Sequence, residues 1–293
     1  MNELIGLGTA LVTPFKADGS VDFEALAKLL DTQLTGFVDY IVVLGTTGEA
    51  ATMSADEKRE VRQFIVKYVN GRLPLVLGVG GNNTAVVCAE LEGMKEELVR
   101  DYAAILSVCP YYNKPNQEGL FQHFCKVAKT STIPVILYNV PGRTGVNLLP
   151  ETVMRIYEAH PDKIAGIKEA SGNIEQIKHL IALTQEFGVK NQDKLLVISG
   201  DDGIACEVMK AGGVGLISVA SNAFAEDFWH IVHEKDQVRQ AKYAEMVRLL
   251  FAEGNPVGIK AVLTQKGIIQ NYLRLPLVPA SKELQAQIQK ELA

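Results

Sequence analysis

The stretch Ile164-Ala165-Gly166-Ile167 is a short apolar run that ends at a charged residue, and seven similar runs occur along the 293-residue chain. These runs are nearly continuous in apolar residues and do not alternate, which is typical of strands buried on both faces of a parallel sheet. We therefore expect eight strands. They are predicted at residues 6–12, 40–44, 73–79, 103–108, 134–138, 164–167, 195–198 and 214–219.

Segments with helical periodicity separate the expected strands. Residues 54–57 have the Ser-x-x-Glu pattern of a capping box, and the Asn-Gly pair at 70–71 is typical of a helix end. Another helix is expected to begin at Pro150, and a further one to run from near Ile174 to Gly188. Strands and helices therefore alternate along the chain.

The number of these units predicts the fold class. Eight strand–helix units in about 225 residues fit an α/β protein of the (β/α)8 TIM barrel type better than a doubly wound sheet of five or six strands. We expect the catalytic barrel at residues 1–224. Residues 225–293 contain no strand-like run and are expected to form a C-terminal helical extension packed on the barrel. Three helices are predicted there, one beginning at Asn255-Pro256 and the last two separated by residues 276–279.

The composition restricts the class of protein. Apolar residues make up 47% and charged residues 22% of the chain, which is ordinary for a soluble globular protein. The net charge of −5 argues against a nucleic-acid binder, because neutralising phosphates requires clustered Lys and Arg. No apolar run approaches the roughly 18 residues of a transmembrane helix, so no membrane association is expected.

The N-terminal residues and the cysteines bear on the cellular compartment. Residues 1–12 lack the basic region and the small-residue cleavage site of a signal peptide. The four cysteines, Cys88, Cys109, Cys125 and Cys206, include no Cys-x-x-Cys pair, so neither a zinc site nor a disulfide framework is indicated. A cytoplasmic protein with reduced thiols is expected.

Reactive side chains follow four of the expected strands. They lie in residues 45–49, 110–113, 138–143 and 168–172. In barrels of this kind the active site lies at the C-terminal ends of the strands, where the loops converge on one mouth. We therefore expect these four segments to form the functional site.

Lys168 is the strongest candidate, because it directly follows the apolar run at 164–167. An ammonium group in such surroundings is desolvated, which lowers the pKa of a lysine and leaves a neutral amine that can attack a ketone. The competing structural interpretation is a lysine whose head group reaches solvent or pairs with Glu169.

Tyr138 ends the strand before Lys168, so in a parallel barrel it is expected beside the amine. Its phenol could carry protons between a bound substrate and water, and Thr46 and Tyr112 could pass them on. For each tyrosine alone, packing in the core or in an interface is the competing explanation.

Two further positions could bind carboxylates. Thr46 and Thr47 lie between glycines, where hydroxyls and backbone N–H groups can approach an anion closely, although a plain tight turn explains the pattern as well. Arg143 offers a planar fork that suits a carboxylate, and a surface arginine is its alternative.

Other motifs are weaker indications of function. Glycines at residues 212–215 near the eighth strand raise the alternative of a barrel that binds phosphate, although close packing explains them too. His230 and His233 share a helix face without an obvious third ligand, so surface or interface histidines are favoured over zinc. A ligand-binding barrel without catalysis is a further alternative, and it would not need the amine.

Three longer motifs resemble the signatures of the dihydrodipicolinate synthase and N-acetylneuraminate lyase superfamily. They are Gly-Thr-Thr-Gly-Glu at residues 45–49, Tyr-Asn-Val-Pro-Gly-Arg-Thr-Gly at 138–145 and Gly-Ile-Lys-Glu-Ala-Ser-Gly-Asn at 166–173. The resemblance extends over essentially the whole chain, from residues 12–15 to 275–276. Motifs of this length in this order are highly specific.

The resemblance implies a role for each candidate residue. Lys168 would form a Schiff base with pyruvate, Tyr138 would be the central proton shuttle, and Thr46 and Tyr112 would complete a relay. The expected substrate-binding residues are Thr47 for the pyruvate carboxylate, Arg143 for the carboxylate of the second substrate, and Gly200 and Ile217.

The implied reaction is an aldol condensation of pyruvate with L-aspartate 4-semialdehyde that gives 4-hydroxy-tetrahydrodipicolinate, the committed step towards diaminopimelate and lysine. No metal and no cofactor is implied. The alternative is another pyruvate-dependent lyase of the superfamily, which cleaves N-acetylneuraminate or a 2-keto-3-deoxy sugar acid. Such relatives typically carry a serine in place of Thr46 and lack Arg143, so the condensation is favoured.

The resemblance also implies an assembly. In the family, the tyrosine that matches Tyr112 projects into the site of a neighbouring subunit, so a homodimer would be the smallest competent unit. A tetramer of two such dimers is common among relatives.

Feedback inhibition by lysine is predicted to be weak or absent. Lysine-inhibited relatives use a glutamate on the third helix and polar or histidine side chains on the second, where this chain has Val86, Ala55 and Lys58, although Asn82 and Tyr111 fit. Without a carboxylate at Val86, the ammonium groups of lysine would be poorly compensated. A steady-state assay tests this, and strong inhibition at submillimolar lysine would contradict it.

Overall fold

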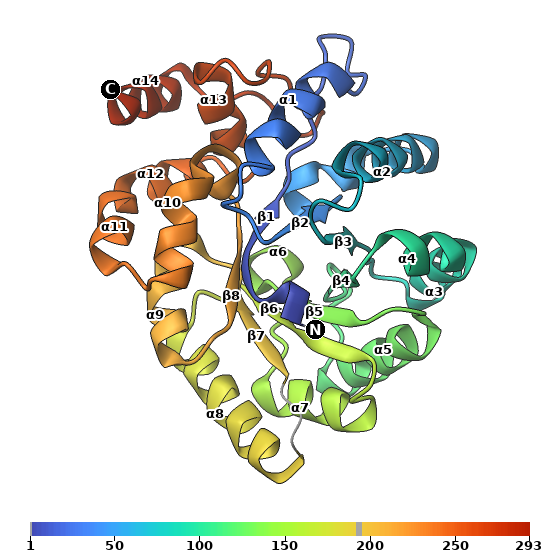
Figure 1. Cartoon of the computed structure of the whole chain (residues 1–293). Helices are drawn as coiled ribbons and strands as arrows, with labels where there is room; N and C mark the ends of the chain where they lie inside the picture. The colour runs from blue at the N-terminus through green and yellow to red at the C-terminus, as the bar shows by residue number, and fades with distance from the viewer. Residues whose placement is uncertain (1, 192–194) are drawn as a thin grey trace. The chain divides into compact units, whose positions relative to one another are not determined.

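The computed structural model describes residues 2–191 and 195–293, and its eight strands close into a parallel barrel in chain order (Figure 1). All eight predicted strands are present, and their ends differ from the predicted ones by at most two residues, so the predicted fold class is confirmed. The strands are β1 (Gly6–Ala10), β2 (Tyr40–Val43), β3 (Leu75–Gly78), β4 (Ala104–Val108), β5 (Val135–Asn139), β6 (Ile164–Glu169), β7 (Leu196–Ser199) and β8 (Gly215–Ser218).

Helices follow the strands along the chain. They are α1 (Phe23–Gln33), α2 (Ala55–Val69), α3 (Thr84–Gly93), α4 (Lys95–Asp101), α5 (Gln117–Thr130), α6 (Pro141–Thr144), α7 (Pro150–Ala159), α8 (Ile174–Asn191), α9 (Ala205–Ala211), α10 (Ser221–His233), α11 (Gln237–Lys242), α12 (Ala244–Phe251), α13 (Val257–Gln265) and α14 (Lys282–Leu292). Short 3-10 helices include η2 (Thr46–Gly48) and η3 (Ala50–Thr52).

The predicted capping of α2 is confirmed. The Ser54 hydroxyl accepts a hydrogen bond from the Glu57 N–H at 3.2 Å, and the Glu57 carboxylate accepts one from the Ser54 N–H at 2.9 Å. The helix ends at Asn70, whose φ of 48° lies in the left-handed region. The predicted start of a helix at Pro150 is also confirmed.

Two helix predictions are wrong. Helix α8 continues past Gly188 to Asn191, because glycine permits a helix end without imposing one. Three helices are predicted in the C-terminal region, but it contains most of α10 together with α11, α12, α13 and α14. One additional boundary separates α10 from α11, where Lys235 has a φ of 57° and the Asp236 side chain caps α11, and the other separates α11 from α12 at Tyr243. Helix α13 does begin just after Asn255-Pro256, as predicted.

The chain divides into two compact units. The first consists of Met1–Ile5 and Leu75–Ile217, and contains β3 to β7 with most of β8. The second consists of Gly6–Pro74 and Ser218–Ala293, and so combines the first two strands with helices α10 to α14. The predicted division of the chain at residues 224 and 225 stays a prediction.

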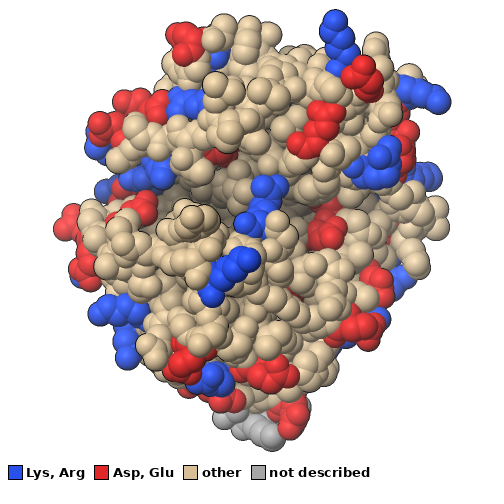
Figure 2. All heavy atoms as spheres, turned by 180° about the vertical axis from the view of Figure 1, so that it is seen from behind, with Lys and Arg blue, Asp and Glu red and all other residues tan. Residues whose placement is uncertain are grey.

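The surface carries charges of both signs. Figure 2 shows basic and acidic side chains interspersed on one face of the molecule, without a continuous basic field there. Among the residues that the structure covers, no helix has both the length and the apolar character needed to cross a bilayer. The four cysteines are free thiols.

In the first unit, the end of β6 is placed by an irregular register with β5. Val135 pairs with Ile164 but Ile136 pairs with Gly166, so Ala165 is an extra residue on β6. A glycine is required at 166, because a Cβ atom there would lie 2.5 Å from the carbonyl oxygen of Leu196. Beyond this point the register is regular, and Tyr138 pairs with Lys168.

In the second unit, a buried ion pair joins the segment after β2 to the C-terminal helices. Glu49 and Lys260 form this pair, and both side chains are almost completely inaccessible. Lys260, on α13, also donates a hydrogen bond to the Tyr272 carbonyl at 3.0 Å and lies 4.3 Å from the centroid of the Phe15 ring. Burial lowers the pKa of Lys260 to about 8, and the charge of Glu49 opposes that shift.

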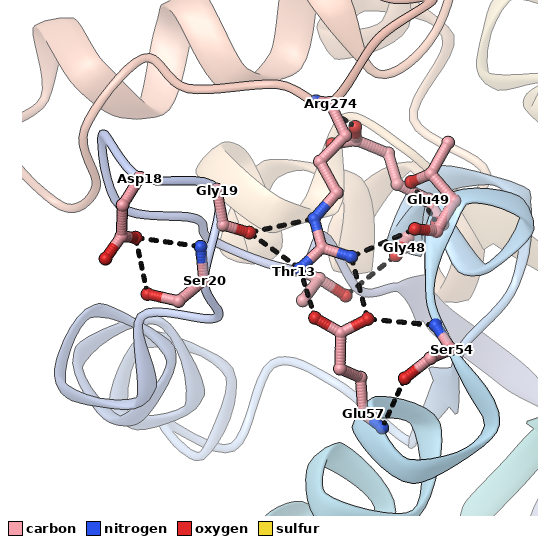
Figure 3. Close-up of polar contacts among 10 residues, drawn as sticks. Thr13, Asp18, Gly19, Ser20, Gly48, Glu49, Ser54, Glu57 and Arg274 are labelled. Atoms are coloured by element: carbon pink, nitrogen blue, oxygen red, sulfur yellow. Dashed lines mark hydrogen bonds and ion pairs between the residues drawn. The ribbon is translucent and has the colours of Figure 1, made fainter.

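Arg274, between α13 and α14, extends the same cluster. Figure 3 shows its guanidinium between the Gly19 carbonyl and the Glu57 carboxylate, and it also donates to the Thr52 carbonyl at 2.9 Å. The hydrogen bond from Arg274 lowers the pKa of Glu57 to about 2. The backbone N–H of Arg274 donates to Glu49 at 3.2 Å. The C-terminal segment thus holds the chain on both sides of η3.

Replacing Lys260 with methionine should destabilise the protein strongly. The variant leaves the Glu49 carboxylate buried without its partner, which typically costs about 3–5 kcal/mol. Lys28→Met is the matched control, because Lys28 pairs with Glu24 at 3.1 Å on the exposed face of α1, and such pairs contribute about 1 kcal/mol or less.

Urea unfolding of both variants measures the difference. The double variant Lys260→Met/Glu49→Gln should recover part of the lost stability, because it leaves no unpaired charge buried. Equal stability of Lys260→Met and Lys28→Met would contradict this account of the cluster.

Candidate active site

Lys168 and Tyr138 form a buried pair at the ends of β6 and β5. Each side chain is 6% exposed, and the Lys168 Nζ lies 4.4 Å from the centroid of the Tyr138 ring. The predicted position of Tyr138 beside the amine is therefore confirmed. The apolar strand sequences bury both residues, and the direct pairing of Tyr138 with Lys168 puts the side chains on the same face of the sheet.

The structure contradicts the alternative in which Lys168 pairs with Glu169. Successive residues of a strand point to opposite faces, so the Glu169 carboxylate lies behind the sheet. There it accepts hydrogen bonds from Asn139 at 2.9 Å, the Ser171 N–H at 2.7 Å and Gln176 at 3.2 Å. Within residues 2–191 and 195–293, no carboxylate lies at ion-pair distance from the Lys168 amine.

The hydrogen bonds of Glu169 belong to a larger network that sequence reasoning missed. Asn139 also donates to the Asn147 side chain at 2.8 Å and accepts from the Leu148 N–H at 2.9 Å. Asn147 in turn donates to Gln176 on α8 at 2.7 Å. Burial raises the pKa of Glu169, although its hydrogen bonds oppose this. The network fixes the backbone next to Tyr138 and Lys168 from the outer side of the sheet.

Gly200 and Ile217 lie where they can shape the surroundings of the amine. A Cβ atom at Gly200 would lie 2.9 Å from Cε and 3.1 Å from Cγ of Lys168, so the glycine leaves room for the lysine stem. Lys168 pairs with Ile198, and Ile198 pairs with Gly215. Because side chains alternate, the buried Ile217 shares the face of Lys168.

Arg143 and Tyr112 are exposed residues of the same unit. Arg143 lies on the short helix α6 directly after β5, and its side chain is exposed. Tyr112 follows β4, has a φ of 73° and is 88% exposed. Its N–H donates to the Thr144 carbonyl at 3.2 Å, which holds the backbone while the phenol stays uncovered by this chain.

Thr46 and Thr47 lie in the second unit on η2, directly after β2. Thr46 is exposed, whereas Thr47 is 3% exposed. The Thr47 hydroxyl accepts a hydrogen bond from the Asn255 side chain at 2.9 Å, and the Thr13 hydroxyl donates to the Gly48 carbonyl at 2.8 Å. The segment does form a tight turn, as the alternative interpretation predicts. The turn also presents the Thr47 hydroxyl, which is hydrogen-bonded to Asn255 from the C-terminal part of the chain.

Histidines do not form a metal centre in the second unit. His230 pairs with Glu234 at 2.9 Å, and His233 pairs with Asp39 at 2.7 Å. In the described parts of the chain, no group of three or more His, Cys, Asp or Glu side chains is arranged to hold a metal ion.

Comparison with known proteins identifies the family of the chain. The sequence model of the dihydrodipicolinate synthetase family matches residues 3–293. The 4-hydroxy-tetrahydrodipicolinate synthase of Parabacteroides distasonis is 48% identical over 94% of this chain and 92% of its own.

Solved structures give the same result. A monomeric dihydrodipicolinate synthase variant superposes with a TM-score of 0.92 at 38% identity, covering 99% of this chain and 96% of the other. The dihydrodipicolinate synthase of Acinetobacter baumannii, solved in complex with pyruvate, has a TM-score of 0.91 at 36% identity, covering 99% and 98%. With a family match over nearly its whole length, the chain belongs to the dihydrodipicolinate synthetase family.

Proposed function

We propose that the chain condenses pyruvate with L-aspartate 4-semialdehyde to give 4-hydroxy-tetrahydrodipicolinate, and that Lys168 carries the reaction as a class I aldolase. The observation that supports this most directly is the buried Lys168 amine, which contacts the Tyr138 ring and has no carboxylate partner in the described residues. An amine that is not held in an ion pair is available to attack a ketone.

The chemistry follows from that amine. Lys168 adds to the pyruvate carbonyl, and loss of water gives a protonated imine that acts as an electron sink. Removal of a proton from the methyl group gives an enamine, whose carbon attacks the aldehyde of the semialdehyde. The amino group of the adduct then displaces Lys168 by transimination. This step closes the ring and returns the free amine, so the cycle itself consumes neither metal nor cofactor.

Proton transfer is assigned to Tyr138. During imine formation the hydroxyl of the carbinolamine must take up a proton to leave as water, and the Tyr138 side chain borders the amine at which this happens. We assign Thr46 and Tyr112 to the relay that reconnects Tyr138 with solvent. The 88% exposure of Tyr112 fits a side chain that acts in the site of a second subunit. A homodimer is therefore the smallest unit we propose, and a tetramer of two dimers the full assembly.

Carboxylate binding is assigned to Thr47 and Arg143. Pyruvate bears a carboxylate next to its ketone, and we assign that group to Thr47. Arg143, exposed directly after β5, would bind the carboxylate of the semialdehyde, and Gly200 and Ile217 would border the bound substrate. Thr46 and Arg143 together favour the semialdehyde over a sugar acid, so cleavage of N-acetylneuraminate or a 2-keto-3-deoxy sugar acid is not favoured. A cytoplasmic location is part of the proposal.

Borohydride reduction in the presence of pyruvate should trap an adduct on Lys168. Mass spectrometry of a digest should find the reduced pyruvyl group on this residue alone, and Lys168→Arg should show neither adduct nor turnover, because a guanidinium does not form the imine.

Lys163→Arg is the matched control. Lys163 lies just before β6 and donates to the Ser131 carbonyl at 3.1 Å. The control therefore replaces a lysine that is close to Lys168 in sequence but is bonded to Ser131. It should keep the adduct. Full turnover by Lys168→Ala would refute the mechanism.

Arg143→Ala should raise the KM for the semialdehyde and leave pyruvate capture intact. A hydrogen bond to a charged group contributes about 1.5–3 kcal/mol, which corresponds to roughly a tenfold to hundredfold higher KM. The KM of Arg143→Lys for the semialdehyde should lie between those of the wild type and Arg143→Ala, because lysine keeps the positive charge but lacks the planar guanidinium group.

The pyruvate concentration that half-saturates trapping on Lys168 provides the second measurement. It should be the same for Arg143→Ala and for the control Arg155→Ala, which removes an exposed arginine paired with Glu118 on the helix layer. An unchanged KM for the semialdehyde in Arg143→Ala would show that the guanidinium does not have the assigned role.

A further inference from the structure

The C-terminal segment determines how the Thr47 hydroxyl can form hydrogen bonds. The Asn255 amide nitrogen donates to the Thr47 oxygen at 2.9 Å, and these side chains are 7% and 3% exposed. A hydroxyl offers one hydrogen and two lone pairs, and an amide NH2 group does not accept. The hydrogen of Thr47 must therefore point away from Asn255.

No protein acceptor receives that hydrogen within the residues that the structure describes. A buried donor without an acceptor is costly, typically by about 1–3 kcal/mol, so such a group usually serves a ligand or a water molecule. The neighbouring carbonyl of Gly48 accepts a hydrogen bond from Thr13 at 2.8 Å and receives none from Thr47. The free direction of Thr47 is thus that of a donor.

We propose that Asn255 is a positioning residue, which fixes the Thr47 hydroxyl as a hydrogen-bond donor to the carboxylate of the keto-acid substrate. The proposal rests on the function assigned above, in which Thr47 binds the carboxylate of pyruvate. Asn255 does not touch the substrate in this scheme. It acts only by occupying a lone pair of Thr47.

The buried cluster around Glu49 supports the same role, because it holds the two partners of this hydrogen bond in place. Glu49 ends η2 with a φ of 53°, a left-handed conformation that is unfavourable for residues other than glycine. Its ion pair with Lys260 ties this strained turn to α13, which begins two residues after Asn255. Thr47 and Asn255 are therefore both anchored by the same pair.

The cluster also prepares the turn for an anion. An unpaired Glu49 two residues from Thr47 would repel a carboxylate. Lys260 compensates that charge, and the backbone N–H of Arg274 binds the other carboxylate oxygen at 3.2 Å. The turn can thus carry an acidic residue close to the proposed carboxylate site.

The variant Asn255→Asp distinguishes a positioning role of Asn255 from a contact that only stabilises the fold. The variant has nearly the same shape, but its carboxylate accepts and does not donate, so the hydrogen bond persists with Thr47 as the donor. A purely structural contact would tolerate this reversal. Under the proposal, the reversal consumes the hydrogen that the substrate needs.

The measurement is the pyruvate concentration that half-saturates borohydride trapping on Lys168, together with KM and kcat. Asn255→Asp should raise this concentration on the order of tenfold or more, with full labelling at saturating pyruvate and a KM for the semialdehyde within about twofold of the wild type. Gln265→Ala is the matched control, because Gln265 is an amide of α13 that donates to the Gln285 carbonyl at 2.8 Å. This control should leave the half-saturating pyruvate concentration and the KM for the semialdehyde unchanged.

A double-mutant cycle removes the effect of the added charge. In Thr47→Val, which lacks the hydroxyl, the further change Asn255→Asp should raise the half-saturating concentration by less than about threefold, because there is no hydrogen left to redirect. An undiminished effect in that background would mean that charge alone acts, and would overturn the proposal. An unchanged concentration in Asn255→Asp alone would overturn it as well.

Asn255→Ala provides the test if the aspartate variant does not fold. It frees the hydroxyl to rotate and should raise the half-saturating concentration about threefold or more, and no change would overturn the proposal. A wild-type protein that forms no adduct on Lys168 would instead refute the proposed function, and with it this inference. The two failures are distinct, because only the second affects the unmodified chain.

Discussion

The alternation of side chains at the end of β6 is the constraint on which the candidate site depends. Lys168 and Glu169 are neighbours in sequence, yet the strand sends the amine to the face of Tyr138 and the carboxylate to the opposite one. Asn139 and Gln176 hold that carboxylate in place. The strand thereby keeps the amine and the carboxylate apart, so Glu169 does not hold the Lys168 amine in an ion pair.

Two buried lysines show how differently one side chain can be used. Both lie over an aromatic ring at similar distance, Lys168 over Tyr138 and Lys260 over Phe15. Lys260 has a carboxylate partner in Glu49 and serves cohesion. Lys168 has an aromatic contact and, among the residues that the structure describes, no carboxylate at ion-pair distance, which suits a nucleophile. A buried carboxylate beside the amine thus separates Lys260 from Lys168, the lysine to which we assign the reaction.

The sequence allowed the parts of this structure that local patterns determine to be predicted. Continuous apolar runs located all eight strands, and because consecutive strands are neighbours in a parallel barrel, Tyr138 could be placed beside Lys168. Contacts between distant segments were out of reach. No periodicity links Thr47 to Asn255, and nothing near Arg274 indicates that it binds the Gly19 carbonyl.

The second unit is assembled from the first and the last parts of the chain, and this has a consequence for biosynthesis. Thr47 and Asn255 are separated by 208 residues, so at about 5–20 residues per second a ribosome needs roughly 10–40 s to make the second after the first. During that interval Glu49 has neither Lys260 nor Arg274 beside it. The nascent N-terminal segment therefore cannot close its turn until the ribosome has also made α13 and the segment around Arg274.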